Sequence, residues 1–127
     1  MPMFEKHFTV EEANDLLPYV ASVFEKIQSI SEELTERKQD LEKLHRSAPG
    51  NGGGDKSVDV VIRSEAIGRY LADLEEKGIL VKDIDTGLID FPHMRENREV
   101  FLCWKLGEKT IEFWHEINAG FKGRQPL

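Results

Sequence analysis

The sequence is poor in cysteine and in long apolar runs. Cys103 is the single cysteine among 127 residues, so an internal disulfide and a disulfide-stapled secreted fold are excluded. The apolar runs are only a few residues long, and no segment is expected to span a bilayer. The first residues lack the basic start and apolar stretch of a secretory signal. A cytoplasmic location is therefore expected, because free thiols are typical of reducing compartments.

Positive charge is also scarce. The chain has 17 Lys+Arg against 24 Asp+Glu, a formal net charge of −7. An acidic surface repels the phosphate backbone, so nucleic-acid binding would need a concentrated basic patch. The pair Lys122 and Arg124 near the C-terminus is too small for one. Nucleic-acid binding is therefore not expected, and the length fits one domain, 1–127.

A long helix is predicted over residues 9–46. Thr9-Val10-Glu11-Glu12 has the pattern of a capping box, in which the first and last side chains bond each other's backbone NH groups. Apolar residues then recur at helical spacing and mark one buried stripe. The stripe comprises Leu16, Val20, Val23, Ile27, Ile30, Leu34, Leu41 and Leu44. Pro18 falls inside this helix and is expected to kink it.

A glycine-rich loop and a second helix follow. Residues 47–56 combine one proline with four glycines, a composition that favours turns. The second helix is predicted over residues 57–77, with Gly78 suited to the left-handed position after its end. At 1.5 Å per residue the two helices are roughly 57 Å and roughly 31 Å long. The second helix therefore covers only part of the first, whose apolar N-terminal portion needs the C-terminal unit or another subunit against it.

Residues 79–127 are predicted to form a β-rich unit. Leu80–Ile84 and Leu88–Phe91 flank Asp85-Thr86-Gly87, as expected for a hairpin. Pro92 is expected to end the second of these strands, and residues 93–97 to form a polar loop.

Two further segments complete this unit. Apolar residues alternate over residues 100–106, as in a strand with one buried face. Residues 110–116 fit a strand or a helix, and the strand is favoured. The predicted fold class is α+β, a long antiparallel helical hairpin packed with a small C-terminal antiparallel β-sheet.

Several blocks of residues, spread over nearly the whole chain, form a recognisable combination. They are Phe8-Thr9-Val10-Glu11-Glu12-Ala13-Asn14, Leu17-Pro18, Val81 to Pro92, Leu102-Cys103-Trp104-Lys105-Leu106-Gly107-Glu108, Trp114-His115-Glu116 and Gly120-Phe121-Lys122-Gly123-Arg124. With these blocks the chain resembles the prokaryotic family called domain of unknown function 2203. The resemblance implies no established activity, substrate or cofactor.

Four residues of the β-rich unit are candidate ligands of a divalent metal: Asp90, Glu108, His115 and Glu116. Imidazole combined with carboxylates suits zinc, iron or nickel. A histidine beside a tryptophan, such as His115, is more often a half-buried, hydrogen-bonded residue than a metal ligand. Cys103 is expected to be a small buried hydrophobe, and as a nucleophile it would need a partner such as His93 or His115 to stabilise its thiolate.

Four other residues are candidate ligand-binding residues: Lys122, Arg124, Trp104 and Trp114. Gly120-Phe121-Lys122-Gly123-Arg124 combines close backbone approach with two cations, which suits an anion or carboxylate site. The alternative is that Arg124 fastens the C-terminal tail to a carboxylate among residues 83–90. The tryptophans fit either a core or subunit interface, or a ligand platform.

Two functions remain open from the sequence. The first is a non-enzymatic protein-interaction module, a homodimer or a partner-binding protein, using the exposed apolar half of the first helix and the tryptophan-bearing sheet. The alternative is a small metal-dependent or ligand-binding enzyme with its site in the C-terminal β unit, formed by His115, Glu108, Asp90 and Arg124. A divalent metal is the only cofactor that either function suggests.

Overall fold

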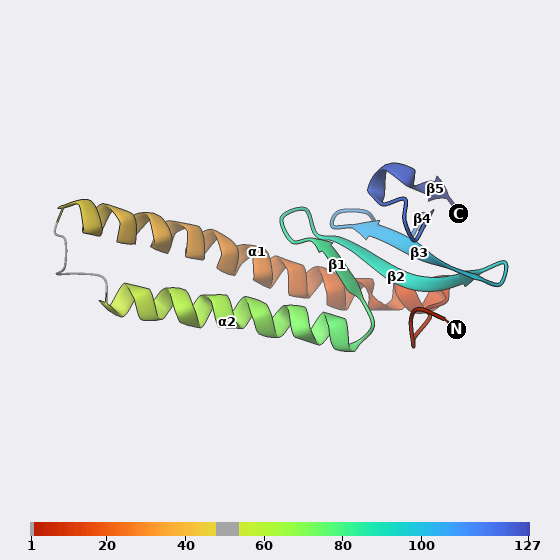
Figure 1. The fold of residues 1–127 in the computed structure, drawn as a ribbon, viewed down its shortest axis with the longest axis horizontal. Coiled ribbons are helices and arrows are strands. Elements are labelled where there is room, and N and C mark those ends of the chain that lie inside the picture. The colour runs from red at the N-terminus through yellow and green to blue at the C-terminus, as the bar shows by residue number, and fades with distance from the viewer. Residues whose placement is uncertain (1, 48–53) are drawn as a thin grey trace.

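The computed structural model describes the backbone of residues 2–47 and 54–127 and the side chains of residues 2–43 and 58–127. Two helices precede an antiparallel sheet, so the α+β prediction is confirmed (Figure 1). The elements are α1 (Val10–Ser47), α2 (Gly54–Glu76), β1 (Leu80–Asp83), β2 (Leu88–Arg95), β3 (Arg98–Lys105), β4 (Phe113–Glu116), the 3₁₀ turn η1 (Phe121–Gly123) and β5 (Gln125–Pro126). None of the described helical segments is long and apolar enough to cross a membrane.

The start of α1 confirms the capping box. The Glu12 backbone NH donates to the Thr9 hydroxyl at 3.0 Å, and the Thr9 NH donates to the Glu12 carboxylate at 2.9 Å. Two otherwise unpaired NH groups at the helix start are thereby satisfied. The helix continues through Pro18, and the expected kink stays a prediction.

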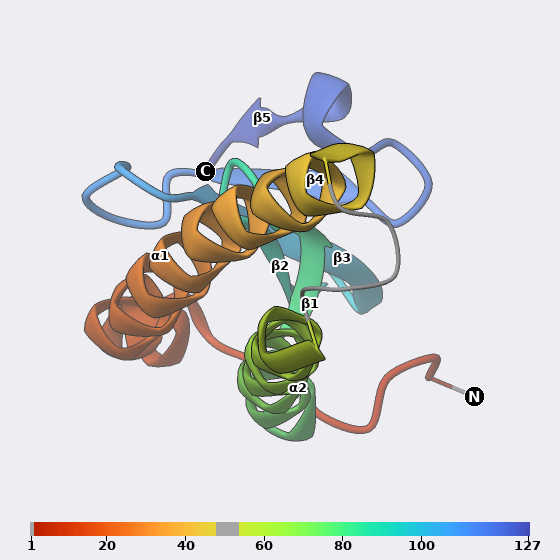
Figure 2. The same ribbon diagram turned by 90° about the vertical axis from the view of Figure 1, so that its left-hand side faces the viewer.

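The two helices lie side by side as an antiparallel hairpin (Figures 1 and 2). The predicted loop 47–56 is shorter than expected, because α2 begins at Gly54 instead of residue 57. The residues between the helices, 48–53, lie outside the described part of the chain. After α2, Gly78 has φ 89° and its NH donates to the Glu75 carbonyl at 2.9 Å. Such a left-handed glycine ends a helix as the sequence predicts.

The sheet has the strand order β1-β2-β3-β4-β5, and every pair is antiparallel. The predicted hairpin at Asp85-Thr86-Gly87 is confirmed, with Gly87 at φ 68°. The strand preference for residues 110–116 is confirmed over Phe113–Glu116.

The prediction that Pro92 ends its strand and that 93–97 is a loop was wrong. Strand β2 runs on to Arg95, and a tight turn at Glu96 and Asn97 leads into β3. The Pro92 carbonyl accepts the Phe8 NH at 2.7 Å, so the backbone polar groups of Pro92 face away from β3. Pairing with β1 has already ended at Asp90. Proline is tolerated here because its missing NH removes no ladder hydrogen bond.

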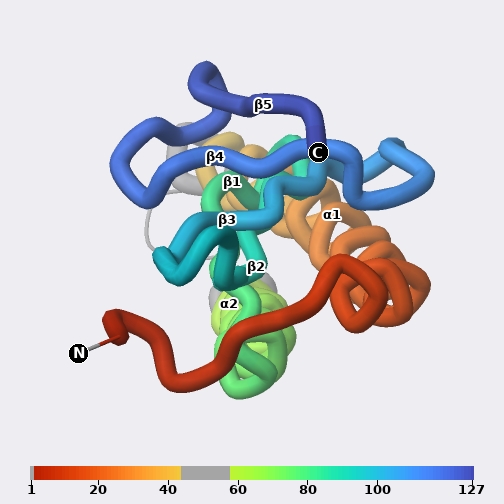
Figure 3. Tube along the Cα trace, turned by 90° about the vertical axis from the view of Figure 1, so that its right-hand side faces the viewer, coloured from red at the N-terminus to blue at the C-terminus, as the bar shows by residue number. Residues whose placement is uncertain are grey.

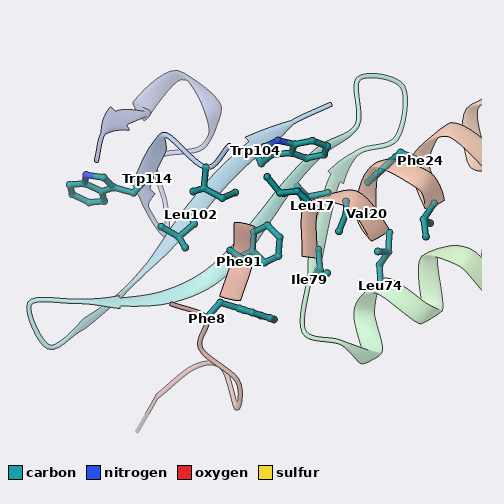
Figure 4. Close-up of a cluster of buried hydrophobic side chains, with 14 of the residues drawn as sticks. Phe8, Leu17, Val20, Phe24, Leu74, Ile79, Phe91, Leu102, Trp104 and Trp114 are labelled. Carbon is teal, nitrogen blue, oxygen red and sulfur yellow. The ribbon is translucent and has the colours of Figure 1, made fainter. Parts of the chain in front are cut away.

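One face of the sheet packs on the helices and forms the core. Alternate residues of β2, β3 and β4 are buried against α1 and the end of α2 (Figure 4). These residues are Ile89, Phe91, Val100, Leu102, Trp104 and Trp114 from the sheet, with Leu17, Val20, Phe24, Ile27 and Leu74 from the helices. The apolar N-terminal half of α1 is therefore covered by the chain's own sheet. The prediction that this half is an exposed interaction surface was wrong.

Candidate metal centre

The opposite face of the sheet carries a buried polar cluster. Side chains alternate between the two faces of a strand, so Asp90, between core residues Ile89 and Phe91, points away from the helices. By the same alternation Cys103 on β3 and His115 on β4 share the face of Asp90. Asp90 is paired with Cys103 in the register of β2 and β3. Three adjacent strands thus bring one carboxylate, one thiol and one imidazole together.

The cluster is compact and closed to solvent. His115 Nε2 lies 3.0 Å from Asp90 Oδ1. One ligand atom each from Asp90, Cys103 and His115 lies within 4.8 Å of the other two. Relative exposure is 1% for Asp90, 1% for Cys103 and 2% for His115.

The hydrogen bond on the other side of the ring fixes the imidazole. His115 Nδ1 lies 2.7 Å from the Glu116 carbonyl oxygen. A carbonyl oxygen can only accept, so Nδ1 carries a proton and donates it. His115 Nε2 is then the nitrogen that serves the cluster, either as a donor to the Asp90 carboxylate or through its lone pair.

Burial is the dominant influence on Asp90. Removal from water raises the pKa of this carboxyl group, while His115, a hydrogen bond from the Cys103 thiol and the charge of Lys82 act in the opposite direction. A buried carboxylate is costly unless a cation or several donors compensate it. Burial therefore favours the neutral carboxyl group unless a bound cation lies beside Asp90.

Cys103 is not prepared as a nucleophile. Burial, followed by the negative charge of Asp90, raises the pKa of its thiol to about 12. The reactive form is the thiolate, which is scarce at neutral pH under these conditions. His93, one of the two predicted partners, instead donates Nδ1–H to the Phe8 carbonyl at 2.6 Å. Cys103 is buried, as the sequence predicts, but it also belongs to a polar cluster that sequence reasoning missed.

The other two predicted metal ligands lie elsewhere. Glu116 contributes its carbonyl to His115 but pairs its carboxylate with Arg98. Glu108 accepts from the Lys105 backbone NH at 2.7 Å and from Arg124 at 2.6 Å. Of the four predicted metal ligands, the structure therefore brings together Asp90 and His115.

Arg124 fastens the C-terminal tail, but to a different acid from the one predicted. The expected partner was a carboxylate of residues 83–90, whereas the observed partner is Glu108 in the turn after β3. The guanidinium also donates to the Cys103 carbonyl at 3.2 Å and stacks on Phe113, 4.1 Å from the ring centroid. The tail returns along β4 as β5, which places Arg124 beside this turn.

The remaining ligand-binding candidates are not gathered at one place. Lys122 is exposed. Trp104 and Trp114 belong to the core facing the helices, with 2% and 6% exposure. The Trp104 indole NH donates to the Glu108 carbonyl at 2.8 Å. Buried rings of this kind support the core interpretation over a ligand platform.

No curated protein and no solved structure matches the chain significantly. A family model described as uncharacterized conserved protein matches residues 6–127, nearly the whole chain and including the cluster. The chain therefore belongs to the family of domain of unknown function 2203 (DUF2203), as the resemblance of its sequence blocks predicts.

Proposed function

We propose that the chain is a metal-binding protein and that Asp90, Cys103 and His115 hold one divalent transition-metal ion, zinc by preference. The observation that carries the proposal is the convergence of an oxygen, a sulfur and a nitrogen donor within 4.8 Å. Zinc accepts this mixture of ligands, with bond lengths of about 2.0–2.3 Å. Donor atoms around a tetrahedral zinc are then roughly 3.3–3.8 Å apart, so small side-chain adjustments suffice.

The surroundings of the cluster support this proposal. Metal-binding histidines commonly donate their second ring NH to a carbonyl or carboxylate, which orients the ligating nitrogen. His115 does so through Nδ1 and Glu116, leaving Nε2 for the metal. A divalent cation would also offset the burial of Asp90 and bind Cys103 as the thiolate.

Three protein ligands leave one position of a tetrahedral ion for water or another ligand. This is the ligand number of catalytic zinc sites, whereas structural sites usually have four protein ligands. The metal-dependent function suggested by the sequence is therefore retained with a different set of ligands, in which Cys103 replaces Glu108 and Glu116.

Metal content of tag-free protein tests the proposal. We expect about one equivalent of zinc per chain to survive gel filtration after zinc loading, because three buried ligands bind far more tightly than surface carboxylates. Cys103→Ser and His115→Gln should lose most of this zinc. Glu112→Gln, which removes an exposed carboxylate from the same unit, should retain it.

Two outcomes would contradict the proposal. One is wild-type protein that retains no zinc although it is folded. The other is equal zinc retention in Cys103→Ser, His115→Gln and the wild type, which would place the ion elsewhere.

A protein-interaction function is the second candidate, on a different surface from the one predicted. Residues 28–43 of α1 and 58–73 of α2 lie at the end of the helical hairpin away from the sheet (Figure 1), and we call them the arm. None of their side chains is fully buried. Val58, Val61 and Ile62 are 54–58% exposed there and, at spacings of three and four, share one helix face. We propose that a second copy of the chain covers this row, giving a homodimer through the arms.

Sedimentation velocity at micromolar concentration tests the dimer. The wild type should sediment as a dimer and Val61→Glu as a monomer, because a buried unpaired carboxylate opposes association. Met94→Glu introduces the same charge at an exposed residue of β2 and should remain dimeric. A monomeric wild type, or dimers in both variants, would contradict this interface.

A further inference from the structure

The segment before α1 is bound to the sheet through one carboxylate. We call residues 3–8 the N-terminal strap. Glu99 on β3 accepts the backbone NH groups of Met3 at 2.6 Å and Phe4 at 2.9 Å, and its carboxylate lies 2.8 Å from His7 Nε2. These donors lower the pKa of Glu99. The Glu99 side chain thus holds the strap at Met3, Phe4 and His7.

The far end of the strap is attached more firmly. The Phe8 NH donates to Pro92, its carbonyl accepts from His93, and its ring is 2% exposed in the core. Figure 3 shows the strap passing below the sheet, away from the C-terminal strand β5. Residues 3–7 can therefore leave the sheet while Phe8 stays in place, provided that the bonds to Glu99 break.

The strap packs on an aromatic side chain that in turn contacts the polar cluster. The Phe4 ring lies 5.4 Å from that of Phe101, and the Phe101 ring lies 5.5 Å from the imidazole of His115. The ammonium group of Lys82 lies 5.0 Å from the Phe101 ring centroid. Phe101 thus separates the strap from the cluster.

A groove lies against the strap and is lined in part by Phe4 and Lys82. It has a volume of ≈ 470 Å³ and is lined by the strap, by the corner between α2 and β1, and by Lys82 and Pro92 of the sheet. Pro92 is two residues from Asp90 on the same strand face, and the charge of Lys82 acts on the Asp90 carboxyl. The groove therefore reaches the immediate neighbours of the cluster.

We propose that the N-terminal strap gates the Asp90–Cys103–His115 cluster, with Glu99 as its latch and Phe101 as the side chain that blocks access from the groove. This inference rests on the proposed metal function for its purpose, because the fourth ligand of a buried three-ligand ion must enter by some route. Release of Glu99 lets Phe4 leave Phe101, and Phe101 can then turn away from His115. The cluster opens to the groove while the core on the other sheet face stays intact.

Thiol labelling tests the gate without any metal, since Cys103 is the single cysteine of the chain. The metal-free protein is treated with a disulfide reagent such as 5,5′-dithiobis(2-nitrobenzoate), and the labelling rate is measured. Glu99→Ala should label roughly tenfold faster than wild type or more, the size expected when hydrogen bonds to a charged group are lost. Glu99→Gln, which keeps one acceptor oxygen, should fall between them. Glu5→Gln removes a carboxylate from the strap itself but leaves the latch, and should label at the wild-type rate.

Two further measurements separate local opening from unfolding. The labelling rates of the variants should depend only weakly on low urea concentrations, because a strap exposes little surface compared with the whole chain. In zinc-loaded protein, transfer of zinc to a chelator should accelerate in the same order of variants. Wild-type labelling rates in both Glu99 variants would overturn the gate even if zinc binds. Faster labelling in a protein that binds no zinc would support the gate and contradict the metal function.

Discussion

At the scale of single residues, Arg124 combines several contacts in one side chain. It is 12% exposed, donates to Glu108 and to the Cys103 carbonyl, and stacks on Phe113 and Phe121. Its Nε is buried without a hydrogen-bond partner among the described residues. The planar guanidinium can serve a carboxylate and two aromatic rings at once, which lysine cannot do as well.

Replacing this side chain should therefore destabilise the protein. Arg124→Ala is expected to reduce the free energy of unfolding by about 1.5–3 kcal/mol, the range for a partly buried hydrogen bond to a charged group. Lys122→Ala, at an exposed neighbouring position, should change it by less than about 0.5 kcal/mol. Urea unfolding of both variants gives the comparison. Equal changes in the two variants would mean that the contacts of Arg124 contribute nothing measurable to stability.

The sequence predicts only part of the polar cluster. Asp90 and His115 could be selected because polar residues are unusual in apolar strands. Glu108 and Glu116 looked equally suitable in the sequence, and Cys103 looked like an ordinary core residue. Side chains alternate with period 2, so a shift of one residue in strand register would exchange the two faces. The register that pairs Asp90 with Cys103 depends on the whole sheet, so the local sequence does not predict it.

At the scale of elements, local signals predict the helices well. The Thr9–Glu12 capping box and the left-handed glycine at Gly78 act within a few residues, and both are found where the sequence places them. The prediction at Pro92 was wrong because the effect of a proline depends on its neighbours in space. At Pro92 the side of β2 opposite β3 contacts the strap and no longer β1, so the missing NH removes no hydrogen bond. The local sequence does not show which segment lies on that side.

The strap makes one pH-dependent contribution to stability. The pKa of Glu99 is lowered in the folded protein, first by the Met3 NH and then by His7. The corresponding stabilisation is therefore complete above the unfolded value of about 4.5 and is lost as pH falls through the lower folded value. The difference in unfolding free energy between wild type and Glu99→Gln should be larger at pH 6 than at pH 3. A difference that stays constant between these pH values would contradict the latch.

At the scale of the whole molecule, the sheet has two different faces. One face packs on the helical hairpin and forms the apolar core. The other bears the polar cluster and is approached by both chain ends, through the contact of Phe4 with Phe101 and of Arg124 with Phe113. The sheet therefore separates the apolar core from the polar cluster.

Cobalt titration of the metal-free protein tests the metal centre most directly, because Co²⁺ reports both its geometry and its ligands. We predict visible bands of tetrahedral cobalt and a thiolate-to-cobalt charge-transfer band in the near ultraviolet, both saturating at one equivalent and bleached by zinc. Cys103→Ser should lose the charge-transfer band, and Glu112→Gln should keep it. A wild-type spectrum no different from that of free aqueous cobalt, or a charge-transfer band that survives in Cys103→Ser, would contradict a metal centre formed by Asp90, Cys103 and His115.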